Sequence, residues 1–186
     1  MTKSLRIIAR IDVKSDRLIK SVQFDGMRDL GDAGKFTQKY FKDGADELLI
    51  LDSVASLFGR NTAVNFLKDS TKKIFIPITL GGGISEINQV NDILNNGADK
   101  ICINTGAVKN KKILKKIAEK FGSQCLVSSI TAKKIKKKKW EVYIDKGREA
   151  TKLDLLDWAK FCEKNGAGEL LITSIDQEGT ELGFDY

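Results

Sequence analysis

A run of three glycines is the feature of this sequence best suited to binding a phosphate group. Gly81-Gly82-Gly83 follows an apolar, β-type segment, and Ser85 precedes a segment with helical periodicity. Glycines let backbone N–H groups approach an anion closely, and a helix that starts beside them favours negative charge. A tight strand-to-helix turn capped by Ser85 would use the same residues. Asn104 and Thr105 follow the next β-type segment and would add amide and hydroxyl donors, so we expect these two residues and the last two glycines to form a phosphate site.

Aspartates at the ends of predicted strands are the candidates for acid–base chemistry. The sequence contains no histidine, so groups that titrate near neutral pH must come from Asp, Glu, Lys or Cys. Asp12 ends the first predicted strand, and Asp52 and Asp176 follow the same pattern at two later ones. A carboxylate in a partly dry cavity can have a raised pKa and act as a general acid or base. Asp12 could instead stabilise its own turn, and a single aspartate does not decide between the two.

Four charged residues stand at or near the starts of predicted strands: Arg6, Glu47, Lys100 and Glu169. Their signs alternate along the series. If the side chains face inward they must pair, because a lone buried charge is unfavourable. A paired ring would plug the bottom of a barrel. The residue types alone favour the simpler interpretation, in which four solvent-exposed charges flank the strands.

Short apolar segments with β propensity alternate with amphipathic segments along the chain. The predicted strands are Leu5 to Asp12, Leu48 to Asp52, Ile74 to Thr79, Lys100 to Asn104, Gln124 to Ile130 and Glu169 to Ser174. The predicted helices are Lys35 to Lys42, Ala63 to Ser70, Ile87 to Asn95, Lys111 to Lys120 and Leu153 to Asn165. This alternation predicts a parallel sheet that is buried on both faces.

The junction between helix and strand repeats three times. Asp43 to Glu47, Asn96 to Lys100 and Asn165 to Glu169 each contain Gly-Ala, with the glycine where a helix end requires a left-handed residue. A recurring junction indicates a repeated βα unit. We therefore predict an α/β fold of the (β/α)₈ TIM-barrel family, with a doubly wound open sheet as the alternative. In a barrel the carboxyl ends of all strands meet at one face, where the glycine loop and the aspartates would converge.

Two inserts and the number of strands complete this prediction. Arg17 to Phe24 is expected to form a hairpin after the first strand, and Trp140 to Ile144 a second strand pair after the fifth. Both would lie above the C-terminal face. The sequence provides about six strands, against the eight of a closed barrel. We expect one domain, residues 1–186, that is truncated after about six strands or completed by a partner.

Composition argues against several classes of protein. Hydrophobic residues make up 41% and charged residues 31%, as in ordinary globular proteins. Without a long apolar run or a signal-peptide core, we expect a cytoplasmic protein that does not bind a membrane. Cys102, Cys125 and Cys162 lack the clustering of disulfide or zinc sites, and all three are expected to be buried. The net charge of +7 comes largely from the lysine run at residues 133–139, which is predicted to be a solvated loop rather than a nucleic-acid surface.

The complete set of motifs resembles one family, the cyclase subunit of imidazole glycerol phosphate synthase, along nearly the whole chain. The resemblance rests on Ile11-Asp12-Val13-Lys14, Lys20, Phe24, Arg28-Asp29, Gly31-Asp32, Gly44-Ala45-Asp46-Glu47-Leu48, Leu51-Asp52, Gly81-Gly82-Gly83-Ile84, Gly97-Ala98-Asp99-Lys100, Ile103-Asn104, Gly122-Ser123-Gln124-Cys125, Trp140-Glu141-Val142, Gly166-Ala167-Gly168-Glu169 and Thr173-Ser174-Ile175-Asp176.

This resemblance implies a (β/α)₈ barrel that takes ammonia from a glutaminase partner in a heterodimer. The family forms imidazole glycerol phosphate and AICAR from PRFAR, a bis-phosphorylated ribulosyl aminoimidazole carboxamide, in histidine biosynthesis, and it implies no cofactor and no metal. Asp12 would be one of two catalytic aspartates, with Lys20 in a loop over the mouth. Gly82 and Asn104 would help to hold one substrate phosphate. Arg6, Glu47, Lys100 and Glu169 would match the family's ammonia gate, which reverses the expectation that they are exposed.

The sequence departs from the family pattern at two positions that matter for catalysis. Thr131 stands where the family has its second catalytic aspartate, and a threonine hydroxyl does not titrate near neutral pH. Glu178 stands where the family has an aspartate after the sixth strand. Two alternatives to a cyclase therefore remain: an ammonia-conducting partner in the amidation of surface-polysaccharide sugars, which a paralogous branch provides, or an inactive fragment.

Overall fold

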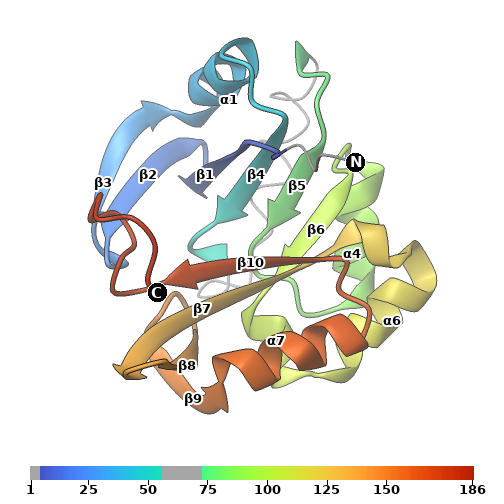
Figure 1. Cartoon of the computed structure of the whole chain (residues 1–186). Coiled ribbons are helices and arrows are strands. Elements are labelled where there is room, and N and C mark those ends of the chain that lie inside the picture. The colour runs from blue at the N-terminus through green and yellow to red at the C-terminus, as the bar shows by residue number, and fades with distance from the viewer. Residues whose placement is uncertain (1–4, 56–72) are drawn as a thin grey trace.

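The computed structural model describes residues 5–55 and 73–186, and it contains one continuous mixed sheet (Figure 1). Six neighbouring strands run parallel in chain order: β1 (Ile8–Lys14), β4 (Glu47–Asp52), β5 (Ile78–Gly81), β6 (Lys100–Ile103), β7 (Leu126–Lys136) and β10 (Glu169–Ser174). This order of strands confirms the predicted α/β fold and agrees with the (β/α)₈ barrel family. The predicted strands overlap the observed ones, but β5 begins four residues later than the segment Ile74 to Thr79, and β7 continues six residues beyond Ile130.

Helices cover the outer face of the curled sheet. They are α1 (Ala33–Lys42), α4 (Ile87–Asn95), α5 (Thr105–Lys109), α6 (Lys112–Phe121) and α7 (Leu155–Lys164), with a 3₁₀ turn η2 (Ser123–Cys125). Aspartates start two of them: the Asp32 carboxylate accepts from Lys35 N, and the Asp154 carboxylate accepts from Leu156 N. The short helix α5 was not predicted. The predicted helix Ala63 to Ser70 lies outside the described residues, and within them no helix is long and apolar enough to cross a membrane.

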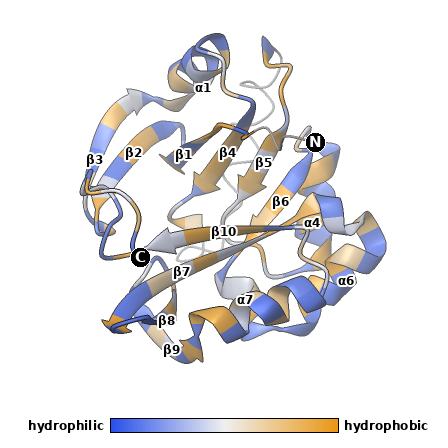
Figure 2. Ribbon diagram, viewed as in Figure 1, coloured by the Kyte–Doolittle hydropathy of each residue, from blue (hydrophilic) through white to orange (hydrophobic). Residues whose placement is uncertain are grey.

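Two separate apolar layers stabilise the curled sheet. The larger layer joins strand residues such as Ile50 and Ile101 to helix residues such as Leu114 and Trp158, so it fills the space between sheet and helices. The smaller consists of Leu49, Cys102 and Val127, with Leu51 and Leu171 against them, all from strands. It therefore lies inside the curl of the sheet. Figure 2 shows mostly apolar residues on β4 and β5, whereas α1 and α7 alternate between hydrophilic and hydrophobic residues.

Side chains bridge the seam between β1 and β10, the first and the last of the parallel strands. No backbone ladder joins these two strands in the described part of the chain. Arg6, just before β1, contacts Glu169, Arg10 Nη1 on β1 donates to Thr173 Oγ1 on β10 at 3.1 Å, and Lys20 on β2 pairs with Glu178 just after β10. Leu170 and Ile172 on β10 remain 40% and 50% exposed. The curl is thus closed by polar contacts at three levels, while the outer face of β10 remains partly uncovered.

Two antiparallel hairpins extend the sheet, as the sequence predicted, although both are longer than expected. The first is β2 (Arg17–Val22) with β3 (Asp25–Asp32), and the second is β8 (Lys139–Ile144) with β9 (Glu149–Asp154). The prediction of a loop for the lysine run is wrong, because most of the run belongs to β7 and β8, although its lysines other than Lys134 are solvent-exposed as predicted. The strands pair there, and Lys134 gains the Asp185 carboxylate at 2.6 Å and the face of Trp140.

The repeated Gly-Ala junctions have the predicted geometry. Gly44, Gly97 and Gly166 have φ values of 93°, 102° and 97°, which is the backbone region that side chains other than glycine rarely adopt. Each glycine follows the last turn of a helix, and its alanine neighbour begins the return toward the next strand. The repeated motif in the sequence therefore reports a repeated unit of structure, as expected.

Candidate active site

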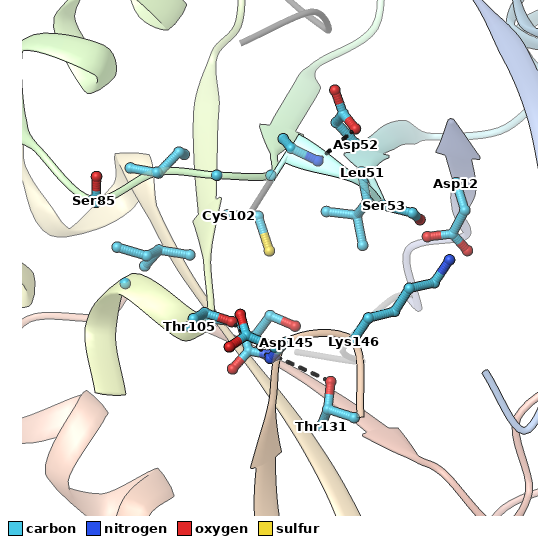
Figure 3. A pocket seen from close by; sticks show the side chains of 18 of the residues that line it. Asp12, Leu51, Asp52, Ser53, Ser85, Cys102, Thr105, Thr131, Asp145 and Lys146 are labelled. Carbon is cyan, nitrogen blue, oxygen red and sulfur yellow. Dashed lines mark hydrogen bonds between the residues drawn. The ribbon is translucent and has the colours of Figure 1, made fainter. Parts of the chain in front are cut away.

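A cavity of about 420 Å³ opens at the carboxyl ends of the parallel strands (Figure 3). Seven residues singled out from the sequence line it together: Asp12, Asp52, Gly82, Gly83, Asn104, Thr105 and Thr131. Five further lining residues have titratable side chains and were not predicted as site residues: Arg10, Cys102, Lys109, Asp145 and Lys146. The convergence follows from the topology, because parallel strands bring their carboxyl ends to one face.

The glycine loop forms one wall of the cavity, and no side chain larger than glycine would fit there. Gly82 and Gly83 have φ values of 120° and 65°, and a Cβ atom on Gly82 would lie 2.6 Å from Asp52 O. The helix start behind the loop is held by Gln89, whose Oε1 accepts from Ser85 N at 2.8 Å and Glu86 N at 3.0 Å. The helix cap is therefore Glu86, with Gln89 as its capping-box partner, and not Ser85. The backbone of the loop can approach an anion, as a phosphate site requires.

Asn104 and Thr105 stand beside this loop with unused hydrogen-bonding capacity. Asn104 Nδ2 donates to Thr131 Oγ1 at 3.2 Å, whereas Asn104 Oδ1 is buried and has no partner among the described residues. Buried polar atoms without a partner are rare in folded proteins, so this atom is available to bind a ligand. Because a threonine hydroxyl both donates and accepts, the Asn104 amide can present either its oxygen or its nitrogen to that ligand. Thr105 Oγ1 accepts from Asp145 N at 3.0 Å, which leaves its own hydrogen for the cavity.

The close approach between the glycine loop and α5 makes Gly106 a sensitive position. A Cβ atom there would lie 2.0 Å from Ile84 O, which is a backbone atom and cannot turn aside. We expect Gly106→Ala to lower the free energy of unfolding by about 1–3 kcal/mol or more, as overpacking does. Thermal or denaturant unfolding measures the effect. Gly26→Ala is the control, because a Cβ atom at Gly26 would meet nothing within 4 Å. Its φ of 62° means that this variant measures the cost of backbone strain without any steric clash. Equal losses in both variants would contradict the steric argument.

Asp12 lies on β1 with its carboxylate in an ion pair inside the cavity. Arg10 Nε and Nη2 lie 3.2 Å and 3.0 Å from Asp12 Oδ1, and the same guanidinium reaches Thr173 on β10. Asp12 is therefore an oriented cavity residue and not simply part of its own turn. Arg10 was not predicted as a site residue, although residues two apart on a strand share a face and Arg10 lies two before Asp12.

Thr131 lies on β7 with only 4% of its surface exposed. Its side-chain oxygen accepts from the Asn104 amide, so this position contributes a hydroxyl in contact with a candidate phosphate-binding residue. The structure thus brings Thr131 into the same cavity as Asp12, as the resemblance implied. Because the Thr131 side chain is a hydroxyl, the cavity has a neutral group where the family has its second catalytic aspartate.

The other candidates hold loops around the cavity. Asp52 Oδ1 accepts from Val54 N and Ala55 N, both at 3.0 Å, at the start of the loop that follows β4. Asp176 accepts from Lys134 N at 2.8 Å and does not line the cavity. Glu178 pairs with Lys20 between the loop after β10 and the first hairpin, and neither residue lines the cavity. Lys20 and Glu178 therefore join the first hairpin to the last loop, and Asp176 joins that loop to β7.

The four charges at the opposite end of the strands form a paired cluster, which we call the floor quartet (Arg6, Glu47, Lys100 and Glu169). Lys100 Nζ lies 2.8 Å from Glu47 Oε2 and 2.7 Å from Glu169 Oε1, and Arg6 contacts the same two carboxylates at 3.3 Å and 3.1 Å. Thr79 Oγ1 donates to Glu47 Oε1 at 2.7 Å. Glu47 is 2% exposed, so the interpretation as solvated flanking charges is wrong for the quartet's centre.

Electrostatics keep the quartet charged. Burial alone would lower the pKa of Lys100, but hydrogen bonds and attraction from Glu169 and Glu47 outweigh it, and the net shift of the pKa is upward. Burial raises the pKa of Glu169, while hydrogen bonds from Lys100 and Arg6 lower it to a net downward shift. Both partners are thus held in their charged forms, which is the condition for a stable buried cluster.

An apolar layer separates the quartet from the cavity. The smaller apolar layer lies two residues further along each strand than the quartet. Leu49 follows Glu47, Cys102 follows Lys100, and Leu171 follows Glu169 at this spacing. Cys102 also lines the cavity, and its sulfur points into it (Figure 3). Burial raises the pKa of the Cys102 thiol to about 12, so the group is neutral at physiological pH. Cys162 is also buried as predicted, whereas Cys125 is partly exposed and that prediction is wrong.

Comparison with known proteins identifies relatives along the whole chain. Residues 6–186 match the family described as histidine biosynthesis protein. An imidazole glycerol phosphate synthase subunit HisF from Legionella pneumophila is 50% identical over 182 residues, which is 98% of this chain and 86% of the relative. The subunits HisF of Bacillus cereus (strain G9842) and Clostridium botulinum (strain Okra) are 45% and 48% identical over 97% of this chain, and 71% and 72% of their own lengths are covered.

Proposed function

This chain belongs to the histidine biosynthesis protein family, and from that premise we propose that it is the cyclase subunit of an imidazole glycerol phosphate synthase. In this role it uses ammonia, supplied by a glutaminase subunit, to convert PRFAR into imidazole glycerol phosphate and AICAR. The observation that carries the proposal is an arrangement along one axis. A phosphate-type loop and Asp12 lie at one end of the strands, and the floor quartet lies at the other.

The cavity residues suit the first step of such a reaction. The glycine loop, Asn104 and Thr105 would hold one phosphate of the substrate and so fix its carbonyl group near Asp12. As ammonia adds to that carbonyl, a nitrogen–carbon bond forms and the carbonyl π bond breaks. The nitrogen then loses a proton, which the Asp12 carboxylate can accept, and the oxygen gains one from an acid. Arg10 holds the Asp12 carboxylate in one orientation for this transfer.

The interior suits the passage of neutral ammonia toward the cavity. Beyond the floor quartet lies the smaller apolar layer, which consists of aliphatic side chains and the protonated Cys102 thiol. These groups carry no charge, so they do not bind or protonate ammonia as it passes. An ammonium ion would have to leave its hydration shell there, at a large cost in free energy. We therefore propose that the glutaminase docks over the quartet and delivers ammonia through it.

Steady-state turnover of PRFAR by the purified chain with free ammonium tests this function. Formation of imidazole glycerol phosphate and AICAR above an enzyme-free blank supports the cyclase. If a folded chain binds the substrate without product formation, a second candidate gains, namely an ammonia-conducting partner in sugar amidation. The neutral Thr131 is the observation that favours that candidate, because a conduit needs the quartet but no second carboxylate.

The ammonia route gives a separate prediction for Lys100. We expect Lys100→Met to lower glutamine-dependent turnover about tenfold or more, while turnover with free ammonium, which can enter through the open mouth, changes little. The reason is that Lys100 joins both carboxylates of the quartet, so its loss leaves Arg6 as the only cation of the quartet. Both rates are measured on the complex with the glutaminase. Lys115→Met, on the exposed face of α6, is the matched control. Equal losses with both nitrogen sources would contradict the gate.

A further inference from the structure

The cavity contains one well-placed carboxylate where the proposed reaction needs two proton-transfer groups. Addition of ammonia to a carbonyl requires a base for the nitrogen and an acid for the oxygen. Asp12 can act as the base, but Thr131 does not titrate near neutral pH. The structure therefore raises the question of which described cavity residue provides the acid.

Most other titratable residues in the cavity wall are committed elsewhere. Arg10 pairs with Asp12, and a guanidinium does not release its proton near neutral pH. Lys109 Nζ lies 3.0 Å from Asp145 Oδ2, so these two residues neutralise each other. Asp52 holds the backbone of its own loop, and Cys102 has its pKa raised to about 12 by burial. Among the described lining residues this leaves Lys146.

The turn between β8 and β9 holds Lys146 over the cavity. Its neighbour Asp145 is tethered twice, by Asp145 N donating to Thr105 Oγ1 and by the ion pair with Lys109. Asp145 and Lys146 have φ values of 46° and 60°, a backbone region that the turn imposes on both. Lys146 Nζ lies 3.1 Å from Met27 Sδ on β3, and its side chain points toward Asp12 (Figure 3).

The surroundings of Lys146 favour release of its proton. The side chain is half-buried, and this burial lowers the pKa of Lys146. Attraction by Asp12 raises that pKa, repulsion by Arg148 and Arg10 lowers it, and attraction by Glu178 raises it, with a net downward shift. The Lys146 ammonium group is thus a stronger acid than the ammonium group of an exposed lysine. A group whose pKa moves toward the working pH is better suited to proton transfer.

We propose that Lys146 is the second acid–base group of this cavity, opposite Asp12, an inference that rests on the proposed cyclase function. As the nitrogen–carbon bond forms, the Lys146 ammonium donates a proton to the carbonyl oxygen, while Asp12 takes one from the attacking nitrogen. The products are a neutral carbinolamine, a neutral amine on Lys146 and a protonated Asp12. Return of the proton from Asp12 to Lys146 restores both groups.

Turnover with free ammonium tests this role. We expect Lys146→Met and Lys146→Arg both to lower kcat/KM about 10²–10⁴-fold, the usual contribution of a general acid or base. The arginine variant keeps the positive charge and cannot release a proton, so retention of half or more of the activity would overturn the role. Lys136→Met, on the exposed end of β7, is the matched control and should behave as wild type. We also expect a difference in pH dependence when kcat/KM is calculated for the concentration of unprotonated ammonia. The wild-type value should fall at alkaline pH as Lys146 loses its proton, and the Lys146 variants should not show this fall.

A second measurement separates this inference from the proposed function, because it requires no turnover. The pH dependence of acetylation by trace acetic anhydride is followed by mass spectrometry for each lysine of the intact chain. We expect the midpoint for Lys146 to lie below that of Lys136, and to fall further in Asp12→Asn because the carboxylate no longer stabilises the ammonium. If the wild type forms no product, the cyclase proposal fails, but the acetylation midpoint of Lys146 still tests whether this lysine has a lowered pKa beside Asp12. An ordinary midpoint for Lys146, or one that ignores Asp12→Asn, overturns the inference.

Discussion

Asp12→Asn is expected to lower the turnover of PRFAR with free ammonium by about 10²–10⁴-fold, the range lost when a general acid or base is removed. Asparagine keeps the shape of the side chain and can still accept a hydrogen bond from Arg10, which lies 3.0 Å from the carboxylate. It cannot take up the proton that the attacking nitrogen must lose. The loss should appear mainly in kcat, because Asp12 is not part of the glycine loop that would bind the phosphate. Steady-state kinetics in ammonium measures both parameters.

A neighbouring carboxylate provides the control for this variant. Asp16 lies in the turn between β1 and β2, outside the cavity, and Asp16→Asn should leave kcat unchanged. Both variants should melt near the wild-type temperature. A rise in KM with unchanged kcat in Asp12→Asn would show that Asp12 binds substrate and does not transfer a proton, and the proposed chemistry would then fail at its first step.

The fold could be predicted largely from local patterns in the sequence, and the errors of that prediction have physical reasons. Gly-Ala at 44–45, 97–98 and 166–167 marked the βα units, because a left-handed helix end leaves few choices of residue. The lysine run was predicted to be a loop because of its charge, but an exposed charged segment can still form a strand, since strand pairing depends on the backbone. Lys133 on β7 lies opposite Glu141 on β8, so opposite charges support the ladder between these strands.

The site was predicted where chemistry coincided with strand ends, and missed where it depended on long-range contacts. Asp12, Gly82 and Asn104 follow directly from the position of polar residues after apolar strands. Lys146 carries no such signal, because it lies in a hairpin turn among other charged residues. Only the tertiary structure, which tethers that turn to Thr105 and Lys109, brings the lysine to the cavity. The floor quartet shows the same limit, since ion pairs between residues 41 or more positions apart in the sequence decide whether its charges are buried.

The two departures from a two-carboxylate cavity, Thr131 and Lys146, should be functionally linked. In Lys146→Met, which lacks the proposed acid, adding Thr131→Asp is expected to restore turnover with ammonium by about 10²-fold or more, within the usual contribution of such a group. The new carboxyl group would lie at the Thr131 position, where Asn104 Nδ2 now donates to Oγ1 at 3.2 Å, so a donor is already in place. Burial at this position, which is 4% exposed, would raise the pKa of the new carboxyl toward the range useful for proton donation.

The same substitution in the wild-type background should have a much smaller effect, because Lys146 already provides the second group. Thr131→Asn is the matched control, since it fills the same space without a titratable proton and should not rescue Lys146→Met. Comparing the four combinations of Thr131→Asp and Lys146→Met gives the coupling between the two sites. A large gain from Thr131→Asp in wild type, with no dependence on Lys146, would contradict the link. It would mean that the cavity simply lacks its second acid, and that the lysine opposite Asp12 takes no part in proton transfer.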